Sequence, residues 1–323
     1  MIAVVARTQT NDLGCLMNYC GALNLDKPAG MTSREVVDKV LRLVRPAKAG
    51  HAGTLDPLAT GVLVVCVGHA TRLISVVQEG RKRYLARFIL GQHSNTDDVT
   101  GTITPGADCT RITQADVAAL LPDFIGRIAQ VPPQFSAVHV QGRRAYDLAR
   151  RGEVVDIKER FVDVYEIRIT EFKLPELELE IDCGSGTYVR SIGRDLGIRL
   201  GCGAVMSELR RLAVGEFHVQ QAVLPDHLTK ETLPGFLQPA LKLVTNWPQR
   251  LLAEAEVTAV RQGKSISAGS DPSAQLPTGT RTALVNHHDS HHNDELVGVA
   301  ELDATTQRLQ PRIIFPAEIP SAD

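Results

Sequence analysis

The sequence predicts an α+β fold with a mixed, mainly antiparallel central sheet, flanking helices and a small β-rich module near the carboxyl-terminal end. Strand-like runs outnumber helical runs, and the two kinds do not alternate strictly as they do in parallel βαβ folds. The chain has 323 residues, enough for one large and one small domain. Its 43% hydrophobic and 22% charged residues are ordinary for a globular protein.

The spacing of apolar residues places the elements of the first half. Thr32 and Glu35 have the spacing of a capping box, and apolar residues follow at helical intervals as far as Val44. Alternating or continuous apolar runs predict strands in the same region. We expect strands at 22–26, 62–67 and 84–90, and helices that begin after Thr32 and after Thr113.

The middle of the chain combines a stiff segment, a basic segment and a pair of long strands. Prolines at 132 and 133 begin an irregular stretch that leads into residues 141–151, where a short basic helix is predicted. A glycine-rich turn at 184–187 then opens into another helix. We expect strands at 161–173 and 177–183 and a helix at 188–200.

Both ends of the chain are predicted to differ from this main domain. Residues 1–20 show no periodicity and are expected to be an arm, with disorder or a misassigned start as the two explanations. Short strand-like runs within 251–316 suit a small β-rich module, and 317–323 form a tail. The polar, His-rich stretch 286–294 is interpreted as a solvated loop, because it lacks the hydrophobic frame of a metal site.

The net charge of −2 conceals an uneven distribution. Residues 213–323 are acidic on balance, whereas the cations of the first part gather in pairs and triplets. Such pairs are usually solvated helix faces, but four of them in one domain favour a polyanionic partner. The clusters are Arg81-Lys82-Arg83, Arg143-Arg144, Arg150-Arg151 and Arg210-Arg211.

The cysteines indicate a reducing environment. The six are scattered without a C-x-x-C pair, so neither a disulfide framework nor a zinc site is indicated. No apolar stretch approaches the roughly 18 residues that span a bilayer. We therefore expect a cytoplasmic protein without a metal and without a membrane partner.

The most informative segment is the loop Gly50–Gly61, which precedes a buried strand. Its glycines and Pro57 constrain the backbone around one carboxylate, Asp56, and one imidazole, His51. An isolated Asp-Pro is usually a turn aspartate that caps its own loop. Because no second carboxylate lies close in sequence, Asp56 is better suited to act as a nucleophile or a base than in a two-metal site.

Other candidate residues are weak when taken singly. His51 alone is more typical of a structural hydrogen bonder, and Lys27 of a solvated turn lysine. Tyr84 begins a strand directly after three cations and could be a core or sheet-edge aromatic. Tyr188 and Arg190 share one face only if the backbone is still extended there.

Taken together, six segments in order closely resemble the TruB family of pseudouridine synthases. The resemblance runs from about residue 21 to 220, roughly two thirds of the chain, and six moderately specific motifs in one order are hard to obtain by chance. The segments are Leu25–Ser33, Gly50–Gly61, Lys82-Arg83-Tyr84, Pro132–Ala137, Gly186–Ser191 and Leu209–Leu212. The resemblance implies a pseudouridine synthase fold, with residues 21–250 as the catalytic domain and 251–316 as a PUA-like RNA-binding module.

The resemblance also implies the reaction. It predicts that uridine 55 in the T-loop of tRNA is isomerised to pseudouridine, without cofactor, metal or guide RNA, by a monomer. The target nucleotide must be flipped out of its stack before it can react. A mobile thumb at about 135–160, which contains Arg143 and Arg144, is expected to close over the RNA stem and to contact phosphates.

Site roles follow from the same resemblance. It makes Asp56 the essential carboxylate, with three routes left open: an ester at C1′, addition to C6, or removal of the 2′ proton. Arg190 is expected to pair with Asp56, and Tyr84 to lie against the base and help remove a proton. The expected substrate-binding residues are His51, which fills the gap left by the flipped nucleotide, Lys27, Tyr188, Leu209, Arg143 and Arg144.

Three other functions remain as alternatives. One is an RNA-binding or tRNA-folding protein without catalysis, which the complete set of site residues argues against. Another is a guide-RNA-dependent synthase, whose basic extensions contrast with the acidic carboxyl-terminal part of this chain. A hydrolase that uses His51 and Asp56 ranks last, because no nucleophile pairing is evident.

Overall fold

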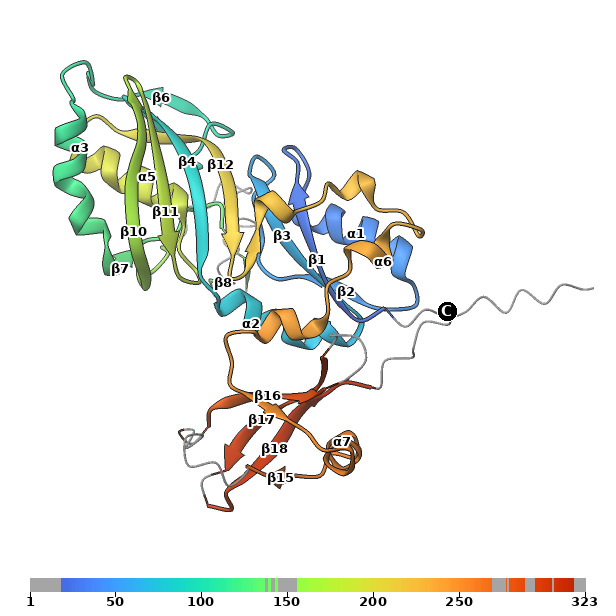
Figure 1. The fold of residues 1–323 in the computed structure, drawn as a ribbon. Helices are drawn as coiled ribbons and strands as arrows, with labels where there is room; N and C mark the ends of the chain where they lie inside the picture. Colours follow the sequence, from blue (N-terminus) through green and yellow to red (C-terminus); the bar gives the residue numbers. More distant parts are fainter. Residues whose placement is uncertain are drawn as a thin grey trace, which may run out of the picture.

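The central sheet is mixed, as the sequence predicts. The computed structural model describes residues 19–136, 139–140, 143–144, 156–268, 277, 279–287, 294–303 and 305–316. Within this part of the chain, nine strands form one sheet in the order β1-β3-β12-β4-β11-β10-β7, with β2 beside β3 and β13 beside β12 (Figure 1). The strands are β1 (Gly21–Lys27), β2 (Ala49–His51), β3 (Thr60–Val67), β4 (Lys82–Leu90), β7 (Gly126–Gln130), β10 (Arg160–Lys173), β11 (Glu176–Cys183), β12 (Ala204–Val214) and β13 (Phe217–His218).

One parallel pairing joins the two halves of this sheet. Strand β12 runs parallel to β3, with Arg210 opposite Thr60 and Arg211 opposite Gly61, whereas the other pairings in the sheet are antiparallel. Gly61 has a φ of +99°, and a Cβ there would lie 2.2 Å from the Arg211 carbonyl oxygen. Glycine therefore allows β3 and β12 to meet directly after the Asp56 loop.

Helices cover the two halves separately (Figure 1). Helices α3 and α5 and the turn η2 pack with β4, β10, β11 and β12 around Phe88, Leu179 and Ile192. Helix α1 and α6 pack on β1 and β3 around Leu25 and Val40. The helices are α1 (Ser33–Val44), η1 (Gly68–Leu73), α2 (Ile74–Glu79), α3 (Gln114–Leu120), η2 (Leu121–Phe124), α5 (Val189–Arg199), η3 (Val219–Gln221), η4 (Pro225–His227), α6 (Leu233–Phe236), η5 (Ala240–Val244) and α7 (Glu254–Arg261).

Five strands near the carboxyl-terminal end form a second sheet, in the order β14-β16-β17-β18-β15. Alternation along these strands divides their side chains between two cores. Leu284 and Val297 pack under α7, whereas Val285 and Val299 join a core that includes Val62 of β3. The strands are β14 (Gln249–Leu251), β15 (Ile266–Ser267), β16 (Arg281–Asn286), β17 (Glu295–Asp303) and β18 (Arg308–Ile314).

The helix predicted over 141–151 is wrong where the structure describes it. Arg143 and Arg144 form strand β9 (Arg143–Arg144), which pairs antiparallel with β8 (His139–Val140). Backbone pairing with β8 thus replaces the local helical bonds that the sequence pattern favoured. The rest of 141–151, residues 1–18 of the predicted arm 1–20 and the tail 317–323 lie outside the described residues.

The remaining predicted elements of the first half are confirmed within a few residues. The capping box of α1 is formed, with Glu35 N–H donating to Thr32 Oγ1 and Thr32 N–H to Glu35 Oε2. The hairpin β5 (Gln92–Ser94) and β6 (Ile103–Pro105), which the sequence did not predict, follows β4. Among the described helices, none is long and apolar enough to cross a membrane.

Candidate active site

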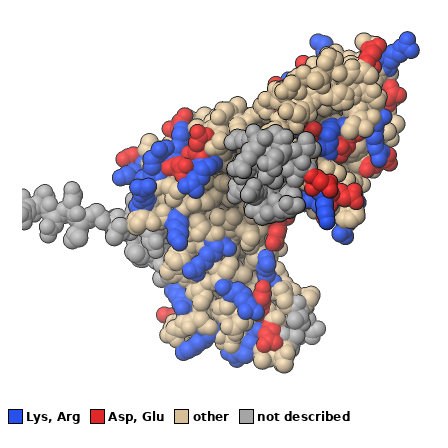
Figure 2. Space-filling view, turned by 180° about the vertical axis from the view of Figure 1, so that it is seen from behind, with Lys and Arg blue, Asp and Glu red and all other residues tan. Residues whose placement is uncertain are grey.

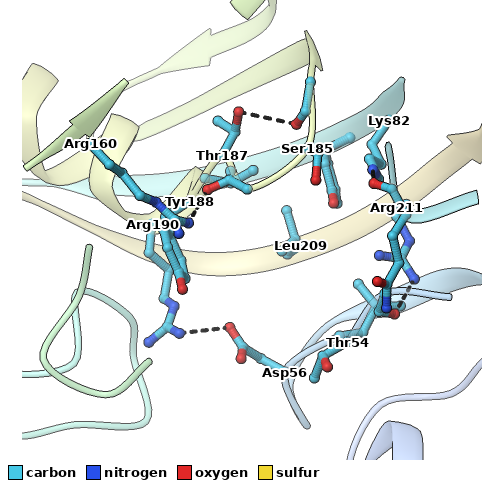
Figure 3. Close-up of a pocket in the computed structure, with 17 residues that line it drawn as sticks. Thr54, Asp56, Lys82, Arg160, Ser185, Thr187, Tyr188, Arg190, Leu209 and Arg211 are labelled. Atoms are coloured by element: carbon cyan, nitrogen blue, oxygen red, sulfur yellow. Dashed lines mark hydrogen bonds and ion pairs between the residues drawn. The ribbon is translucent and has the colours of Figure 1, made fainter. Parts of the chain in front are cut away.

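A cavity of about 320 Å³ opens at the junction of the two sheet halves (Figure 3). This volume lies within the range of small-molecule sites. Its walls come from the Asp56 loop, from β4 and β12, and from the turn before α5. The lining residues are Gly53, Thr54, Leu55, Asp56, Gln78, Lys82, Tyr84, Arg160, Gly184, Ser185, Gly186, Thr187, Tyr188, Val189, Arg190, Leu209 and Arg211.

The Asp56 loop is fixed by contacts on both sides of the carboxylate. Ser33, the first residue of α1, donates its hydroxyl to the Leu55 carbonyl at 3.1 Å and accepts from the Leu55 N–H at 2.8 Å. On the other side, the Pro57 carbonyl accepts the Gly30 N–H at 2.8 Å. Because both neighbours are hydrogen-bonded, the position of the Asp56 side chain is largely determined by α1 and by the turn that follows β1.

Arg190 holds the carboxylate from the opposite wall. Its Nη2 lies 3.0 Å from Asp56 Oδ2, and its Nη1 lies 3.4 Å from Asp98 Oδ2. The guanidinium also donates to the carbonyls of Thr96 at 2.9 Å and Phe135 at 3.1 Å. Only 7% of the Arg190 side chain is exposed, against 37% for Asp56, so the carboxylate is the member of the pair that faces the cavity.

Burial and the neighbouring charges both act on the pKa of Asp56. Burial raises the pKa of the Asp56 carboxyl above its ordinary value, the Arg190 cation opposes this rise, and the Asp98 anion adds to it. Asp98 is itself held by hydrogen bonds from the Thr96 and Thr100 hydroxyls and from the Thr100 N–H. Arg190 thus serves two carboxylates, of which only Asp56 lines the cavity.

Tyr84 and Leu209 provide apolar surface in the cavity. Leu209 of β12 is 8% exposed, pairs with Ala86 of β4, and lies between the two walls in Figure 3. Tyr84 is half-buried, and burial raises the pKa of its phenol. The hydroxyl therefore stays protonated near neutral pH and can donate a hydrogen bond.

Tyr188 presents its ring to the cavity from the residue before α5, where the backbone is still extended. Its N–H donates to Gln130 Oε1 at 2.8 Å, and its carbonyl accepts from Gln130 Nε2 at 3.0 Å. The guanidinium carbon of Arg160 lies 4.7 Å from the centre of the ring. The extended backbone explains why Tyr188 and Arg190, two positions apart, reach the same cavity.

Lys27 and His51 are not among the residues that line the cavity. Lys27 is fully buried at the end of β1, and its ammonium donates to the carbonyls of Pro28, Met31 and Pro57. Burial lowers the pKa of Lys27 to about 8. His51 ends β2, and its Nδ1 has no hydrogen-bond partner among the described residues.

Several lining residues were missed by sequence reasoning. Arg211, 1% exposed, donates to the carbonyls of Val62 at 2.6 Å and Gly53 at 3.1 Å. Lys82 is buried and donates to the carbonyls of Gln78 and Gly80. Both residues stand in basic clusters that were considered as phosphate contacts. Side chains alternate between the two faces of a strand, and this alternation was the sequence signal that could have placed both residues on the buried face.

Two of the basic clusters are committed to contacts within the protein. Arg81 Nη2 lies 2.9 Å from Asp182 Oδ2, and Arg210 Nη2 lies 2.8 Å from Asp26 Oδ2. Figure 2 shows Lys and Arg beside Asp and Glu over the upper part of one face, whereas Lys and Arg prevail on the lower lobe that the five-stranded sheet forms. The side chains of Arg143 and Arg144, and residues 150 and 151, lie outside the described part of the chain.

The His-rich stretch 286–294 is described only at its ends. His287 Nδ1 lies 2.6 Å from Asp294 Oδ1, where β16 leads out and β17 begins. This contact closes the base of the connection between the two strands. The residues between these two lie outside the described part of the chain.

The comparison with solved structures identifies the fold class. The chain superposes on a chain of the structure described as "Crystal Structure of a Cbf5-Nop10-Gar1 Complex" with a TM-score of 0.71 and 26% identity, over 94% of this chain and 87% of that one. A chain of "Structure of H/ACA RNP bound to a substrate RNA containing 2'-deoxyuridine" matches with a TM-score of 0.68 at 24% identity, over 94% of this chain and 87% of that one, and at that identity it supports the fold alone. The architecture is therefore the pseudouridine synthase fold.

The comparison of sequences identifies the family. The model described as "TruB family pseudouridylate synthase (N terminal domain)" matches residues 41–189, and the one described as "tRNA pseudouridylate synthase B C-terminal domain" matches residues 190–240. The protein named tRNA pseudouridine synthase B in Synechococcus elongatus is 40% identical over 310 residues, which cover 93% of this chain and all of that protein. The protein of the same name in Mesorhizobium japonicum is 48% identical over 197 residues, 61% of this chain and 60% of that one. This chain therefore belongs to the TruB family of pseudouridylate synthases, and it is an isomerase.

Proposed function

We propose that this chain converts uridine 55 in the T-loop of tRNA to pseudouridine, with Asp56 as the essential carboxylate. The observation that carries the proposal is the Asp56–Arg190 pair at 3.0 Å, set in a cavity that Tyr84, Tyr188 and Leu209 also line. A flat ring suits a cavity with apolar and aromatic walls. The relatives named tRNA pseudouridine synthase B support tRNA as the substrate.

The reaction is an isomerisation that needs no other reactant. The N1–C1′ bond of the uridine breaks, the base turns, the C5–C1′ bond forms, and the hydrogen on C5 is replaced by one on N1. A carboxylate can form an ester at C1′, add to C6 or accept the 2′ proton. All three routes require Asp56 to be ionised, and the Arg190 cation beside it favours the ionised form.

The other site residues support binding in this proposal. Tyr188 stacks on the base, Leu209 lines the uracil pocket, and Tyr84 lies against the base and assists removal of the C5 or 2′ proton. His51, next to the Asp56 loop but outside the cavity lining, fills the gap that the flipped nucleotide leaves in the RNA. Lys27 acts on substrate binding through the Pro57 carbonyl that its buried ammonium holds.

The RNA is held outside the cavity by two further regions. The thumb at about 135–160 brings Arg143 and Arg144 to phosphates of the stem, which positions the RNA without reading its sequence. Residues 251–316 serve as the PUA-like RNA-binding module beside the catalytic domain 21–250. Lys and Arg on the lower lobe in Figure 2 support that role, although residues 213–323 are acidic on balance.

A guide-RNA-dependent synthase is the second candidate, because one structural match at 26% identity is to a Cbf5-Nop10-Gar1 complex. Relatives that are 40% identical over the whole of their length are instead named for tRNA, which favours tRNA as the substrate. We propose that the chain acts alone, as a monomer in the cytoplasm. The two candidates differ in what the purified chain can do without partners.

The test is pseudouridine formation by the purified chain on an unmodified tRNA transcript, without cofactor, guide RNA or other protein. We expect one pseudouridine, at position 55, and none in a transcript with cytidine at that position. Asp56→Ala is expected to abolish turnover while the dissociation constant for tRNA stays within about tenfold. A well-folded wild-type protein that forms no product would contradict the proposal, and product only with a guide RNA would favour the second candidate.

A further inference from the structure

The position of the Tyr188 ring is not explained by its own local structure. Tyr188 makes no side-chain cap for α5, and it follows a turn with glycines at 184 and 186, the second of which has a φ of +81°. Glycines loosen the backbone on the side from which the ring is presented. A ring that has to stack on a base therefore needs an external support.

Gln130, the last residue of β7, holds the backbone of Tyr188. Its amide oxygen accepts the Tyr188 N–H at 2.8 Å, and its amide nitrogen donates to the Tyr188 carbonyl at 3.0 Å. Gln130 is 2% exposed, so these two bonds form away from water. One side chain thus satisfies both backbone groups of Tyr188 and fixes the orientation of its peptide units.

Arg160, the first residue of β10, holds the ring itself. Its guanidinium carbon lies 4.7 Å from the centre of the Tyr188 ring, within the range of a cation–π contact. The same guanidinium donates to the carbonyl of Gly186, in the turn that leads to Tyr188. Figure 3 shows Arg160 and Tyr188 side by side on the wall that also carries Arg190.

The two supports belong together because Arg160 and Gln130 are opposite each other in the β10–β7 pairing. One cross-strand pair therefore reaches both the backbone and the ring of the same tyrosine. Arg160 Nε is buried and has no partner among the described residues, which is costly for stability. Such a cost is more readily explained by a role at the site than by a role in folding alone.

We propose that Gln130 and Arg160 are positioning residues for pseudouridine formation, and that together they hold Tyr188 against the substrate base. The proposal rests on the proposed function, in which Tyr188 stacks on the flipped uridine. Neither residue needs to touch the RNA in this arrangement. Their loss is therefore expected to change the rate of the chemical step and not the affinity for tRNA.

The first experiment measures single-turnover rate constants and tRNA dissociation constants for Arg160→Ala, Arg160→Lys and Gln130→Glu. Lysine keeps the charge without the planar stack, and glutamate keeps the acceptor for the Tyr188 N–H without the donor to its carbonyl. We expect each variant to lower the rate constant about 10- to 100-fold, as a small misplacement of a reacting group does. The dissociation constant is expected to stay within about threefold.

Arg127→Ala is the matched control, because Arg127 lies over the Phe161 ring at 5.1 Å, between the same two strands but away from the cavity. It is expected to leave the rate constant unchanged. A merely structural role of Arg160 and Gln130 would lower the melting temperature without changing the rate constant at a temperature where the variant is folded. That result would overturn the proposal, as would a reduced salt dependence of tRNA binding in Arg160→Ala, which indicates a phosphate contact.

A double-mutant cycle tests whether Arg160 acts through Tyr188. In a Tyr188→Ala background, Arg160→Ala is expected to cause little further loss of rate, because the ring that it holds is already absent. Multiplication of the two single effects would show that Arg160 acts independently and would overturn the proposal. Tyr188→Phe, which keeps a ring for the guanidinium, is expected to remain sensitive to Arg160→Ala.

A spectroscopic arm needs no activity, so it separates this proposal from the proposed function. In protein labelled with 3-fluorotyrosine, the Tyr188 ¹⁹F resonance is the one that disappears in Tyr188→Phe. We expect it to shift and broaden in Arg160→Ala and to stay in place in Arg127→Ala. An unchanged resonance in Arg160→Ala would overturn the positioning role even if the enzyme is active, whereas the shift would be seen even if the substrate were not tRNA.

Discussion

Arg190 stands between two carboxylates, and the consequences for Asp56 depend on that arrangement. Asp98 is buried, accepts hydrogen bonds from threonine donors and does not line the cavity, so a ligand in the cavity need not displace it from Arg190. Asp56 is held by the same cation but faces the cavity. In the proposed function, Asp98 and two carbonyls therefore keep Arg190 in place when Asp56 engages a substrate.

The first prediction concerns the pH dependence of this site. Burial raises the pKa of Asp56, and the proposed reaction needs its ionised form, so activity is expected to fall as the pH decreases through a pKa above the ordinary aspartate value of about 3.9. Arg190→Gln removes a cation that lowers this pKa. The acid limb of kcat/KM should therefore move to higher pH.

Arg194→Gln provides the control for that experiment. Arg194 lies on the same helix and pairs with Asp97 and Asp195, at 2.8 Å each, and not with Asp56. The acid limb of kcat/KM in Arg194→Gln is expected to coincide with that of the wild type. If the limb of Arg190→Gln also stayed in place, Asp56 would not be the titrating group.

At this scale the sequence predicted the Asp56 loop, its pairing with Arg190 and the presence of Tyr84, Tyr188 and Leu209 in the same site, but not Arg211 or Asp98. The pairing came from the resemblance, because 134 positions separate the two residues and no local pattern relates them. Arg211 was missed because its burial depends on the β3–β12 pairing, which places it opposite Gly61. Asp98 was missed because it reaches Arg190 from the loop between β5 and β6, and the sequence pattern did not reveal the hairpin that these two strands form.

Several elements meet at the loop that carries Asp56. Helix α1, the turn after β1 and the last residues of β3 each contact the loop. Strand β12 then closes against β3 only because position 61 carries no side chain. The carboxylate thus depends on a strand junction formed by segments about 150 positions apart in the sequence.

The second prediction is that Gly61→Ala disrupts this junction. A Cβ there would lie 2.2 Å from the Arg211 carbonyl oxygen and 2.7 Å from its nitrogen, so the strands would have to separate. We expect the free energy of unfolding, measured in urea, to fall by about 4 kcal/mol or more. Pseudouridine formation should be lost with it.

Gly30→Ala is the matched control for that substitution. Gly30 also has a positive φ, +79°, but no described atom lies within 4 Å of a Cβ built there. Only backbone strain remains, so the expected cost is about 1–2 kcal/mol. Equal costs for the two substitutions would show that the β3–β12 contact is not what limits position 61.

Elements with caps and long apolar runs were predictable, and short paired ones were not. The box of Thr32 and Glu35 and the runs that became β10 and β11 carry their signal locally. Strand β9 has two residues, and it forms because it pairs with β8. The basic composition of 141–151 says nothing about such a pairing, so the helix predicted there was wrong at Arg143 and Arg144.

Two of the four cation clusters that suggested a polyanionic partner make their contacts within the protein instead. Arg81, Arg210 and Arg211 are committed to carboxylates or carbonyls within the protein. Of the four clusters, Arg143-Arg144 and Arg150-Arg151 remain as candidates for the proposed RNA contacts, beside the Lys and Arg of the lower lobe in Figure 2. The expected electrostatic interface is therefore narrower than the sequence alone indicates.

The third prediction is that Arg143→Ala combined with Arg144→Ala weakens tRNA binding and flattens its salt dependence. Loss of two phosphate contacts should reduce the slope of log K against log salt concentration by about two. Arg168→Ala is the control, because Arg168 pairs with Glu166 and Glu180 at the surface of the sheet. An unchanged slope in the double variant would remove these arginines from the interface.

The last prediction concerns cooperativity between the two sheets. Val62 of β3 shares one core with Val285 and Val299 of the five-stranded sheet, and all three are at most 2% exposed. Unfolding the small sheet alone would expose that face of β3 to water, at roughly 25 cal/mol for each Å² of apolar surface. We therefore expect the two sheets to unfold in one transition.

The single tryptophan, Trp247, packs at the edge of this shared core and reports on the boundary between the sheets. Its fluorescence, the far-ultraviolet circular dichroism and the loss of pseudouridine formation are expected to change with the same midpoint in urea. Val285→Ala, which leaves a cavity in the shared core, should lower all three midpoints together, at a cost of about 2 kcal/mol. If the fluorescence changed at a lower urea concentration while activity persisted, the small sheet would unfold independently, and its contact with β3 would contribute little to holding the Asp56 loop.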